Sequence, residues 1–351
     1  MIEGRINLYS DTQTRPTPGM REAIASAPVG DEQHMADPSV SALCEQVAEH
    51  LGKARAVFLP SGTMCNEIAI LVHCRAGDEI YAHETAHIVH FEGGGPAALA
   101  GAAVHSLPGS RGIYTAESLT AALRDPGDRY APASRLVEVE QSANLPGGTV
   151  WSETDLQPIR DVVDTRGLVL HMDGARLPNA AVAAGVPMAE FARFADSVWI
   201  DLSKGLGCPV GGVLAGTDEF IEAAWRWKQR IGGAMRQAGM MAAAGVYALQ
   251  HNLARLADDH ANARRFADLI TAADGVELAS AAVETNLVFF DIEKTGVSAP
   301  ALSAALEARG INIGAFSATR LRACTHLDVD LAAIEEAAQV LLEELMRLRQ
   351  S

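Results

Sequence analysis

The sequence has little cysteine. Its cysteines are odd in number, scattered along 351 residues, and none stands in the C-x-x-C spacing of a redox or zinc motif: Cys44, Cys65, Cys74, Cys208 and Cys324. This pattern predicts neither a disulfide framework nor a zinc site, so we expect no bound metal. Free thiols are typical of a reducing compartment, and we expect a cytoplasmic protein.

Long apolar runs are also missing. The longest, from about Ala238 to Leu249, falls short of the ~18 residues of a transmembrane helix and is interrupted by Gly245. The N-terminus lacks the pattern of a signal peptide, so we expect no membrane partner. Residues 2–5 read Ile-Glu-Gly-Arg, which matches a protease-cleavage tag and is equally compatible with a natural sequence.

Basic residues are scarce. Lysine and arginine number 28 against 44 aspartates and glutamates, which gives a net charge of −16. Such a balance argues against a surface that binds nucleic acid or an anionic membrane. Internal repeats, low-complexity segments and the G-x-G-x-x-G loop of dinucleotide-binding proteins are absent as well. What remains is an acidic globular chain, whose length is typical of two domains of ~150 residues.

The pattern that is present is an alternation of short apolar runs and helical periodicity. The runs typical of strands are Ala54–Leu59, Glu79–Ala82, Ala102–Leu107, Arg135–Gln141, Leu168–Asp173, Ser197–Leu202 and Gly211–Gly216. Helical patterns separate most of them. This alternation predicts an α/β fold with a mostly parallel sheet, helices on both faces, and ligands at the carboxyl ends of the strands.

Flanking segments complete the expected organisation. An N-cap at Asp37 followed by Pro38 predicts a helix that ends at Gly52. After residue 216 we expect helices over 218–230 and 235–271, short strands over 287–292, 311–315 and 320–325, and a final helix from 328. The chain then divides into an N-terminal arm with a short helix (1–36), a large domain (37–250) and a small α+β domain (251–351).

One stretch suggests chemistry. Residues 197–207 form an apolar, strand-like run that ends in Lys204, between Ser203 and Gly205. A lysine amine bonds to a carbonyl cofactor only after it loses its proton, which a partly desolvated site near other cations favours. Ser-Lys-Gly is a short match, and an ordinary surface lysine is the commoner case. Other residues have to distinguish the two interpretations.

Further groups at strand ends favour the cofactor interpretation. The Ser61-Gly62-Thr63 turn joins a strand to a helix start, which is either an ordinary N-cap or a phosphate site. His87, Asp173 and Arg176 also fall near strand ends. With Lys204 they supply what pyridoxal phosphate requires: a phosphate cradle, an aromatic face, a carboxylate for the pyridine nitrogen and an amine for the aldehyde.

The chain resembles the L-threonine aldolase family of fold-type I pyridoxal-phosphate enzymes, in the β-eliminating-lyase-like group, over nearly its whole length. The segments that carry the resemblance are Ser10-Asp11-Thr12, Gly30-Asp31, Asp37-Pro38, Pro60-Ser61-Gly62-Thr63-Met64, Ala86-His87-Ile88, Asp173-Gly174-Ala175-Arg176-Leu177, Leu202-Ser203-Lys204-Gly205-Leu206-Gly207, Met235-Arg236-Gln237-Ala238-Gly239 and Thr325-His326-Leu327-Asp328. The family's fold adds a smaller C-terminal α+β domain to a mostly parallel sheet.

The resemblance implies a role for each matching residue. Lys204 carries the cofactor as a Schiff base, Asp173 pairs with its pyridine nitrogen and His87 stacks on its ring, so these are the expected catalytic residues. The remaining expected cofactor-binding residues are Ser61, Gly62, Thr63, Arg176, Ser203 and Arg236. The substrate carboxylate would be gripped by Arg176 and Arg322, since a planar guanidinium suits it, with Ser10 as a helper.

Two subunits build each site in this family, so the resemblance also implies a homodimer or homotetramer. Arg236 and a cation just upstream would reach the phosphate of a neighbour. The upstream position appears here as Gln229, between Lys228 and Arg230. Either basic neighbour is a candidate for that contact.

The implied activity is retro-aldol cleavage of a β-hydroxy-α-amino acid, such as L-threonine, L-allo-threonine or a bulkier analogue, to glycine and an aldehyde. One departure affects it: the family's Glu-Asn-Thr-His-Asn is Glu140-Gln141-Ser142-Ala143-Asn144 here. Ala143 therefore replaces a histidine that contacts the β-hydroxyl. Either His34 or His90 is a candidate for the lost imidazole, and an ordinary loop histidine is the commoner interpretation of both.

Because of this departure, other activities stay open. The same residues are compatible with another pyridoxal-phosphate-dependent lyase that catalyses β-elimination, or with an aminotransferase. A non-enzymatic ligand-binding protein of the same fold is a third alternative, which the complete Lys, Asp, Arg and His set argues against.

Overall fold

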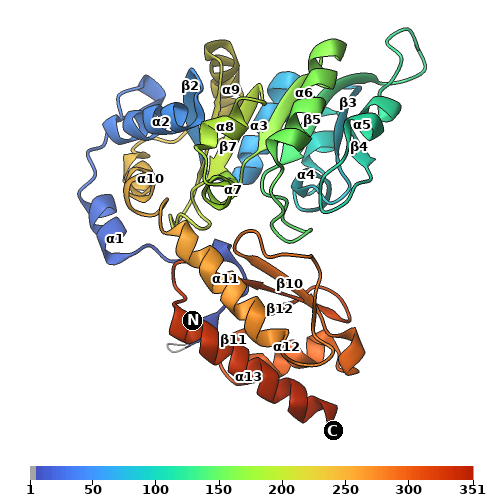
Figure 1. The fold of residues 1–351 in the computed structure, drawn as a ribbon. Helices are drawn as coiled ribbons and strands as arrows, with labels where there is room; N and C mark the ends of the chain where they lie inside the picture. Colours follow the sequence, from blue (N-terminus) through green and yellow to red (C-terminus); the bar gives the residue numbers. More distant parts are fainter. Residues whose placement is uncertain (1–4, 351) are drawn as a thin grey trace.

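The structure is a computed structural model that describes residues 5–350 (Figure 1). Residues 2–4 of the Ile-Glu-Gly-Arg stretch lie outside the described residues. Within the described part of the chain, no helix is both long and apolar enough to cross a membrane. The helices are α1 (Pro18–Ala25), α2 (Pro38–Leu51), α3 (Gly62–His73), α4 (His87–His90), α5 (Ala116–Ala122), α6 (Glu153–Arg166), α7 (Leu177–Ala184), α8 (Met188–Ala192), α9 (Asp218–Arg230), α10 (Gly239–His251), α11 (Leu256–Ile270), α12 (Ala299–Ala308) and α13 (Leu331–Arg349). Short helical turns are η1 (Asp11–Gln13), η2 (Glu32–His34), η3 (Pro96–Ala100) and η4 (Glu293–Thr295).

A seven-stranded sheet forms the centre of the large part. Its strands are β2 (Arg55–Leu59), β3 (Asp78–His83), β4 (Ala103–Leu107), β5 (Ala133–Glu140), β6 (Val169–Asp173), β7 (Ser197–Asp201) and β8 (Gly212–Gly216). They lie in the order β2-β8-β7-β6-β5-β3-β4, and only β8 runs antiparallel to its neighbours. The predicted mostly parallel α/β sheet is therefore confirmed.

Helices cover both faces of this sheet because side chains of a strand alternate between its faces. On β7, Val198 and Ile200 pack in the cluster that contains residues of α2, α7 and α10. Trp199, between them, packs on the other face with residues of α3 and α9. The whole strand is buried, which explains its continuous apolar sequence.

The small part has its own core below the large sheet in Figure 1. Its antiparallel sheet has the order β12-β13-β10-β9, built from β9 (Glu277–Leu278), β10 (Leu287–Asp291), β12 (Gly314–Ala315) and β13 (Arg320–Cys324). The N-terminal arm joins this part, because β1 (Ile6–Asn7) pairs in parallel with β11 (Ile311–Asn312) and Leu8 belongs to the same core. The proposed division at residues 36 and 250 stays a prediction.

Two expected elements are wrong in their extent. The single helix expected over 235–271 is two helices, α10 and α11, separated by residues 252–255. Asn252 ends α10, and its side-chain amide donates to the carbonyl of Leu206, so a tertiary hydrogen bond holds the break. The strand expected over 311–315 is divided into β11 and β12, because Ile311 faces the N-terminal arm and Gly314 faces β13.

A buried ion pair ties the N-terminal region to α9. The Nζ atom of Lys228 lies 2.8 Å from Oε2 of Glu32, and neither side chain has any exposed surface. The second oxygen of Glu32 accepts the backbone N–H of Met235. Removing one member of such a pair leaves the other charge buried without a partner.

We therefore expect Glu32→Gln to lower the free energy of unfolding by about 3–5 kcal/mol. Urea unfolding at one fixed protein concentration measures this change. The matched control is Glu335→Gln, which breaks an exposed pair with Arg265 and should have little effect. Equal effects of the two substitutions would contradict the prediction.

Candidate active site

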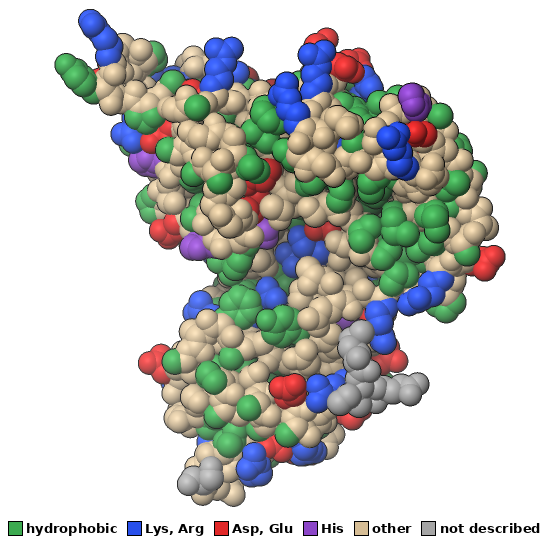
Figure 2. All heavy atoms as spheres, turned by 180° about the vertical axis from the view of Figure 1, so that it is seen from behind, with side chains coloured by type: hydrophobic (Ala, Val, Ile, Leu, Met, Phe, Trp, Pro, Cys, Tyr) green, Lys and Arg blue, Asp and Glu red, His purple; other side chains and the backbone are tan. Residues whose placement is uncertain are grey.

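The candidate site is a cavity of about 330 Å³, within the range of small-molecule sites. It is lined by Ser10, Thr12, Gly62, Thr63, His87, Phe91, Glu140, Asn144, Asp173, Ala175, Arg176, Trp199, Asp201, Lys204, Phe316 and Arg322. Most of these residues follow strands of the large sheet, and the others come from the N-terminal arm and the small part. Figure 2 shows the molecule narrowing between its two parts, with Lys or Arg side chains visible in the hollow.

The start of α3 borders the cavity. Ser61 is the N-cap, and its hydroxyl accepts the N–H of Met64 at 3.2 Å, so the Ser61 side chain caps the helix and does not line the cavity. Gly62 and Thr63 do line it. Their backbone N–H groups belong to the first turn, where intrahelical partners are lacking. A Cβ atom at position 62 would clash with the ring of Trp199, so glycine is required there.

Asp173 is held by a buried amide. Its Oδ2 atom accepts from Nδ2 of Asn66 at 2.8 Å, and its Oδ1 atom accepts the N–H of Ala175 at 3.0 Å. The Oδ1 atom of Asn66 accepts in turn from Nε1 of Trp199 at 2.7 Å. The carboxylate is only 1% exposed and ends β6 in the cavity wall. It therefore has one fixed orientation toward whatever enters.

His87 stands at the start of α4, where two glutamates hold it. Its backbone N–H donates to Oε2 of Glu140 at 2.8 Å, and its Nδ1 atom lies 2.8 Å from Oε1 of Glu92. Burial alone would lower the pKa of His87. The hydrogen bond with Glu92 and the negative charges of Asp173 and Glu92 outweigh burial, so the pKa is raised.

Burial raises the pKa of several glutamates of the large part. Burial, followed by the charge of Asp173, raises the pKa of Glu140 to about 7. Burial, followed by the charge of Glu92, raises the pKa of Glu67 to about 8. Glu138 is also buried, and neither of its carboxylate oxygens has a hydrogen-bond partner among the described residues. Of these three residues Glu140 lines the cavity, so its carboxyl group holds a proton near neutral pH more readily than an ordinary glutamate does.

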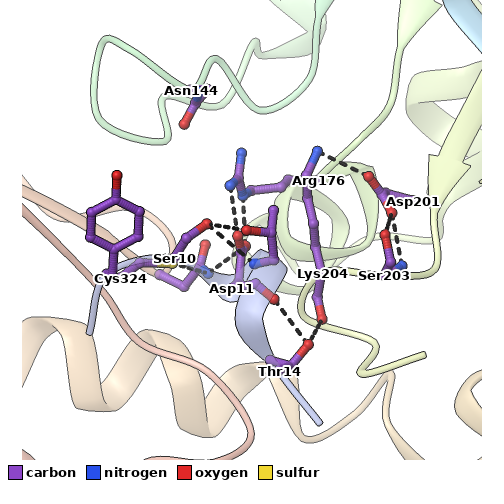
Figure 3. A network of polar contacts seen from close by, with 12 residues as sticks. Ser10, Asp11, Thr14, Asn144, Arg176, Asp201, Ser203, Lys204 and Cys324 are labelled. Carbon is purple, nitrogen blue, oxygen red and sulfur yellow. Dashed lines mark hydrogen bonds and ion pairs between the residues drawn. The ribbon is translucent and has the colours of Figure 1, made fainter. Parts of the chain in front are cut away.

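Lys204 lies three residues beyond the end of β7 and is held by Asp201. Its Nζ atom lies 3.0 Å from Oδ2 of Asp201. The Oδ1 atom of Asp201 accepts both the backbone N–H and the hydroxyl of Ser203, each at 2.8 Å. Figure 3 shows Asp201 linked to both residues. Ser203 is thus engaged by Asp201 and does not line the cavity, although it was expected to bind the cofactor.

Two arginines line the cavity near the N-terminal arm. Arg176 makes two parallel hydrogen bonds to the carboxylate of Asp11, each of 2.8 Å, and both side chains are buried (Figure 3). Arg322 donates from Nη2 to the carbonyl of Tyr9 at 3.0 Å, and its guanidinium carbon lies 4.6 Å from the centroid of the Phe316 ring. Its buried Nε atom has no partner within the described chain. One donor of Arg322 is thus left unsatisfied by the described chain.

Ala143 and His90 are not brought into the cavity. Ala143 is buried, and its backbone N–H donates to the carbonyl of Thr149. The neighbouring Asn144 lines the cavity instead. His90 is exposed, and its Nε2 atom lies 2.7 Å from the carbonyl oxygen of Glu84. The expected contacts of these two residues with a substrate find no support in the geometry of one chain.

Arg236 also lies outside the cavity. It is 61% exposed and forms a 2.8 Å ion pair with Asp31. Of the two basic residues beside Gln229, Lys228 is buried against Glu32 and so cannot reach a second subunit. Arg230 is exposed. It is therefore the accessible candidate for that contact.

The sequence reasoning missed several residues of the site. Asp11 and Asp201 stand inside segments that were singled out, and the available signal was a carboxylate directly after Ser10 and one two positions before Ser203. Asn66, on the second turn of α3, gave no signal because its partners are far away in the chain. Phe316 gave none either, since only the fold brings it beside Arg322.

Comparisons with known proteins identify the family of the chain. A family model described as "Beta-eliminating lyase" matches residues 7–293. The low-specificity L-threonine aldolase 1 of Arabidopsis thaliana is 36% identical over 354 residues, covering 100% of this chain and 99% of the relative. The low specificity L-threonine aldolase of Escherichia coli (strain K12) is 39% identical over 334 residues, covering 95% and 97%.

Solved structures share the fold. A threonine aldolase of Leishmania major superposes with a TM-score of 0.81 at 20% identity, covering 97% of this chain and 99% of its own. A putative L-allo-threonine aldolase of Listeria monocytogenes gives 0.79 at 22% identity, covering 98% and 96%. At these identities the likeness concerns the fold, and it confirms the predicted fold-type I architecture.

The raised pKa of Glu67 predicts a pH effect on stability. The folded state keeps the proton of this carboxyl up to about pH 8, whereas the unfolded chain loses it near 4.5. The contribution of Glu67 to the free energy of unfolding is therefore complete below pH 4.5, and it is lost as the pH rises through about 8. Glu67→Gln carries no such titration, so its stability should fall less steeply over this range.

Urea unfolding of wild type and Glu67→Gln across this pH range, without added ligand, measures the difference. Glu335→Gln, which removes an exposed carboxylate, serves as control and should follow wild type. Parallel curves for wild type and Glu67→Gln would show that Glu67 ionises normally.

Proposed function

This chain belongs to the β-eliminating lyase family, together with the low-specificity L-threonine aldolases, and we propose that it cleaves β-hydroxy-α-amino acids to glycine and an aldehyde with pyridoxal phosphate as cofactor. The predicted family and the predicted lyase class are confirmed. The observation that carries the proposal is the cavity in which Lys204, Asp173, His87 and the start of α3 converge.

The residues present fit pyridoxal phosphate. The N–H groups of Gly62 and Thr63 suit its phosphate, and the buried carboxylate of Asp173 suits its pyridine nitrogen. The His87 imidazole offers a ring face, and the Lys204 amine is the group that would bond to its aldehyde. When bound, the cofactor supplies an electron sink for the bond that breaks at the α-carbon.

Arg322 and Arg176 would orient the substrate. Both guanidinium groups line the cavity, and Arg322 has a buried donor without a partner in the described chain. A carboxylate gripped by two cations cannot rotate freely, so the bond to be cleaved keeps one orientation. Asn144, whose Oδ1 lies 3.4 Å from Nη1 of Arg322, borders the same region.

Proton transfer requires a group whose pKa is close to the operating pH. Glu140 lines the cavity and has a pKa of about 7, so it is our candidate to take the proton of the β-hydroxyl. Its oxygens also accept the backbone N–H groups of His87 and Asn144, which fix their direction. This assignment needs no histidine at position 143.

Three expectations that are more specific than the family and the lyase class remain proposals. They are a Schiff base at Lys204, a cytoplasmic location, and a homodimer or homotetramer with shared sites. The exposure of Arg236 and Arg230 is compatible with contact to a second subunit. The natural substrate among L-threonine, L-allo-threonine and bulkier analogues is part of the proposal to be tested.

We expect purified protein with pyridoxal phosphate to show a visible absorption band that borohydride reduction removes, and Lys204→Ala to lack it. Incubation with a panel of β-hydroxy-α-amino acids should then yield glycine and an aldehyde, measured by chromatography. Keto acid and ammonia in place of glycine would favour β-elimination. Absence of the band in wild type would contradict the proposed cofactor.

Arg322→Lys should raise KM for the substrate about 10- to 100-fold, since it loses charge-assisted hydrogen bonds to the carboxylate, with a smaller change in kcat. Steady-state kinetics with the best substrate of the panel measures both constants. The matched control is Arg320→Lys on the same strand, whose exposed side chain pairs with Asp291. An unchanged KM in Arg322→Lys would remove Arg322 from substrate binding.

A further inference from the structure

Asp201 is a cavity residue without a role in the proposed reaction. It ends β7, and its side chain is 7% exposed. One oxygen accepts two hydrogen bonds from Ser203, and the other lies 3.0 Å from Nζ of Lys204. The carboxylate thus connects the amine end of the lysine side chain to the backbone of its own loop.

The other acidic side chains in or next to the cavity are engaged elsewhere. Asp11 is bound by both nitrogens of the Arg176 fork, and Asp173 is bound by Asn66. Glu140 accepts two backbone N–H groups. Within the described residues, Asp201 is the acidic side chain that forms an ion pair with Lys204. Such a pair requires the ammonium form of Lys204, that is, a lysine whose amine is not bonded to a carbonyl carbon.

We infer that Asp201 is a positioning residue that holds the ammonium group of Lys204 whenever the lysine is not bonded to the cofactor. The inference rests on the proposed function, because it takes Lys204 as the residue that bonds to pyridoxal phosphate. It assigns to Asp201 a part in the exchange of amines that precedes cleavage.

The exchange has a simple balance. The C=N double bond between the cofactor aldehyde carbon and Nζ of Lys204 would be replaced by a C=N double bond between that carbon and the substrate nitrogen. Counted for unprotonated imines, the substrate ammonium group would give up its three N–H protons and Nζ would take up three, so that Lys204 leaves as an ammonium group and no electrons are gained or lost. The released ammonium group then lies within reach of Asp201, in the position that the structure shows.

This role predicts opposite effects on two equilibria. The ion pair stabilises both states in which the lysine is free, namely the protein without cofactor and the protein with bound substrate. Removing it should therefore tighten the binding of pyridoxal phosphate to the cofactor-free protein and weaken the binding of an amino acid to the holoenzyme. A residue that merely maintained the fold would weaken both.

Asp201→Asn tests the inference. The amide oxygen can still accept from Ser203, but the NH₂ group then faces Lys204, donor against donor. We expect the Kd of pyridoxal phosphate to fall and the Kd of glycine to rise, each by about 10- to 100-fold, as for loss of a hydrogen bond between charged groups. Both are read from the visible absorption spectrum, without measuring turnover.

Two further variants serve as controls. Asp196→Asn removes the same charge just before β7, where Asp196 contacts Arg160 and Leu170, and should leave both constants unchanged. Asp201→Glu restores the charge one methylene further out and should give intermediate values. It also carries the test if Asp201→Asn does not fold, since the same opposite changes, smaller in size, are expected.

The two dissociation constants distinguish a positioning role of Asp201 from a purely structural one. Constants that stay unchanged or move in the same direction in the Asp201 variants would overturn the inference. In that case the wild-type absorption band and cleavage activity still support the proposed function. Absence of the band in wild type would instead contradict the proposed function itself.

Discussion

The site depends on one hydrogen-bond donor group, the side-chain NH₂ of Asn66. It donates to Asp173 at 2.8 Å and to Glu92 at 2.7 Å, and Glu92 in turn lies against His87. The carbonyl of the same amide accepts from Trp199, whose ring packs on Gly62. One buried amide therefore sets the positions of a carboxylate, an imidazole and the start of α3. Buried polar groups need such partners, so these positions are interdependent.

Charge balance is the second constraint on the cavity. The chain is strongly acidic, and its cavity contains several buried carboxylates, yet each has a defined partner or a raised pKa. Asp11 is neutralised by Arg176, Asp201 faces Lys204, and Glu140 holds a proton more readily than usual. Unpaired buried charge is costly, so pairing and protonation are the two available solutions. The same groups then become available for binding and proton transfer.

The sequence predicted the ends of a helix correctly where residues close in the chain stabilise them. The helix α2 begins after Asp37 and ends at Gly52, as its N-cap, its proline and its glycine predict. The break between α10 and α11 was missed, because it is held by the bond from Asn252 to Leu206, far away in the chain. Ala143 was expected near the substrate from its motif, whereas the backbone turns its neighbour Asn144 into the cavity.

The sequence by itself determined the family, the alternation of strands and helices, and the residues that end the central strands. Strand ends in a parallel sheet meet at one edge, so Asp173 and Lys204 could be placed together from their positions alone. Only the tertiary structure decided which partner each side chain has. Asp201 holds Lys204, Glu32 removes Lys228 from the surface, and Phe316 reaches Arg322. These contacts follow from packing between segments far apart in the chain, for which spacing along the sequence carries no signal.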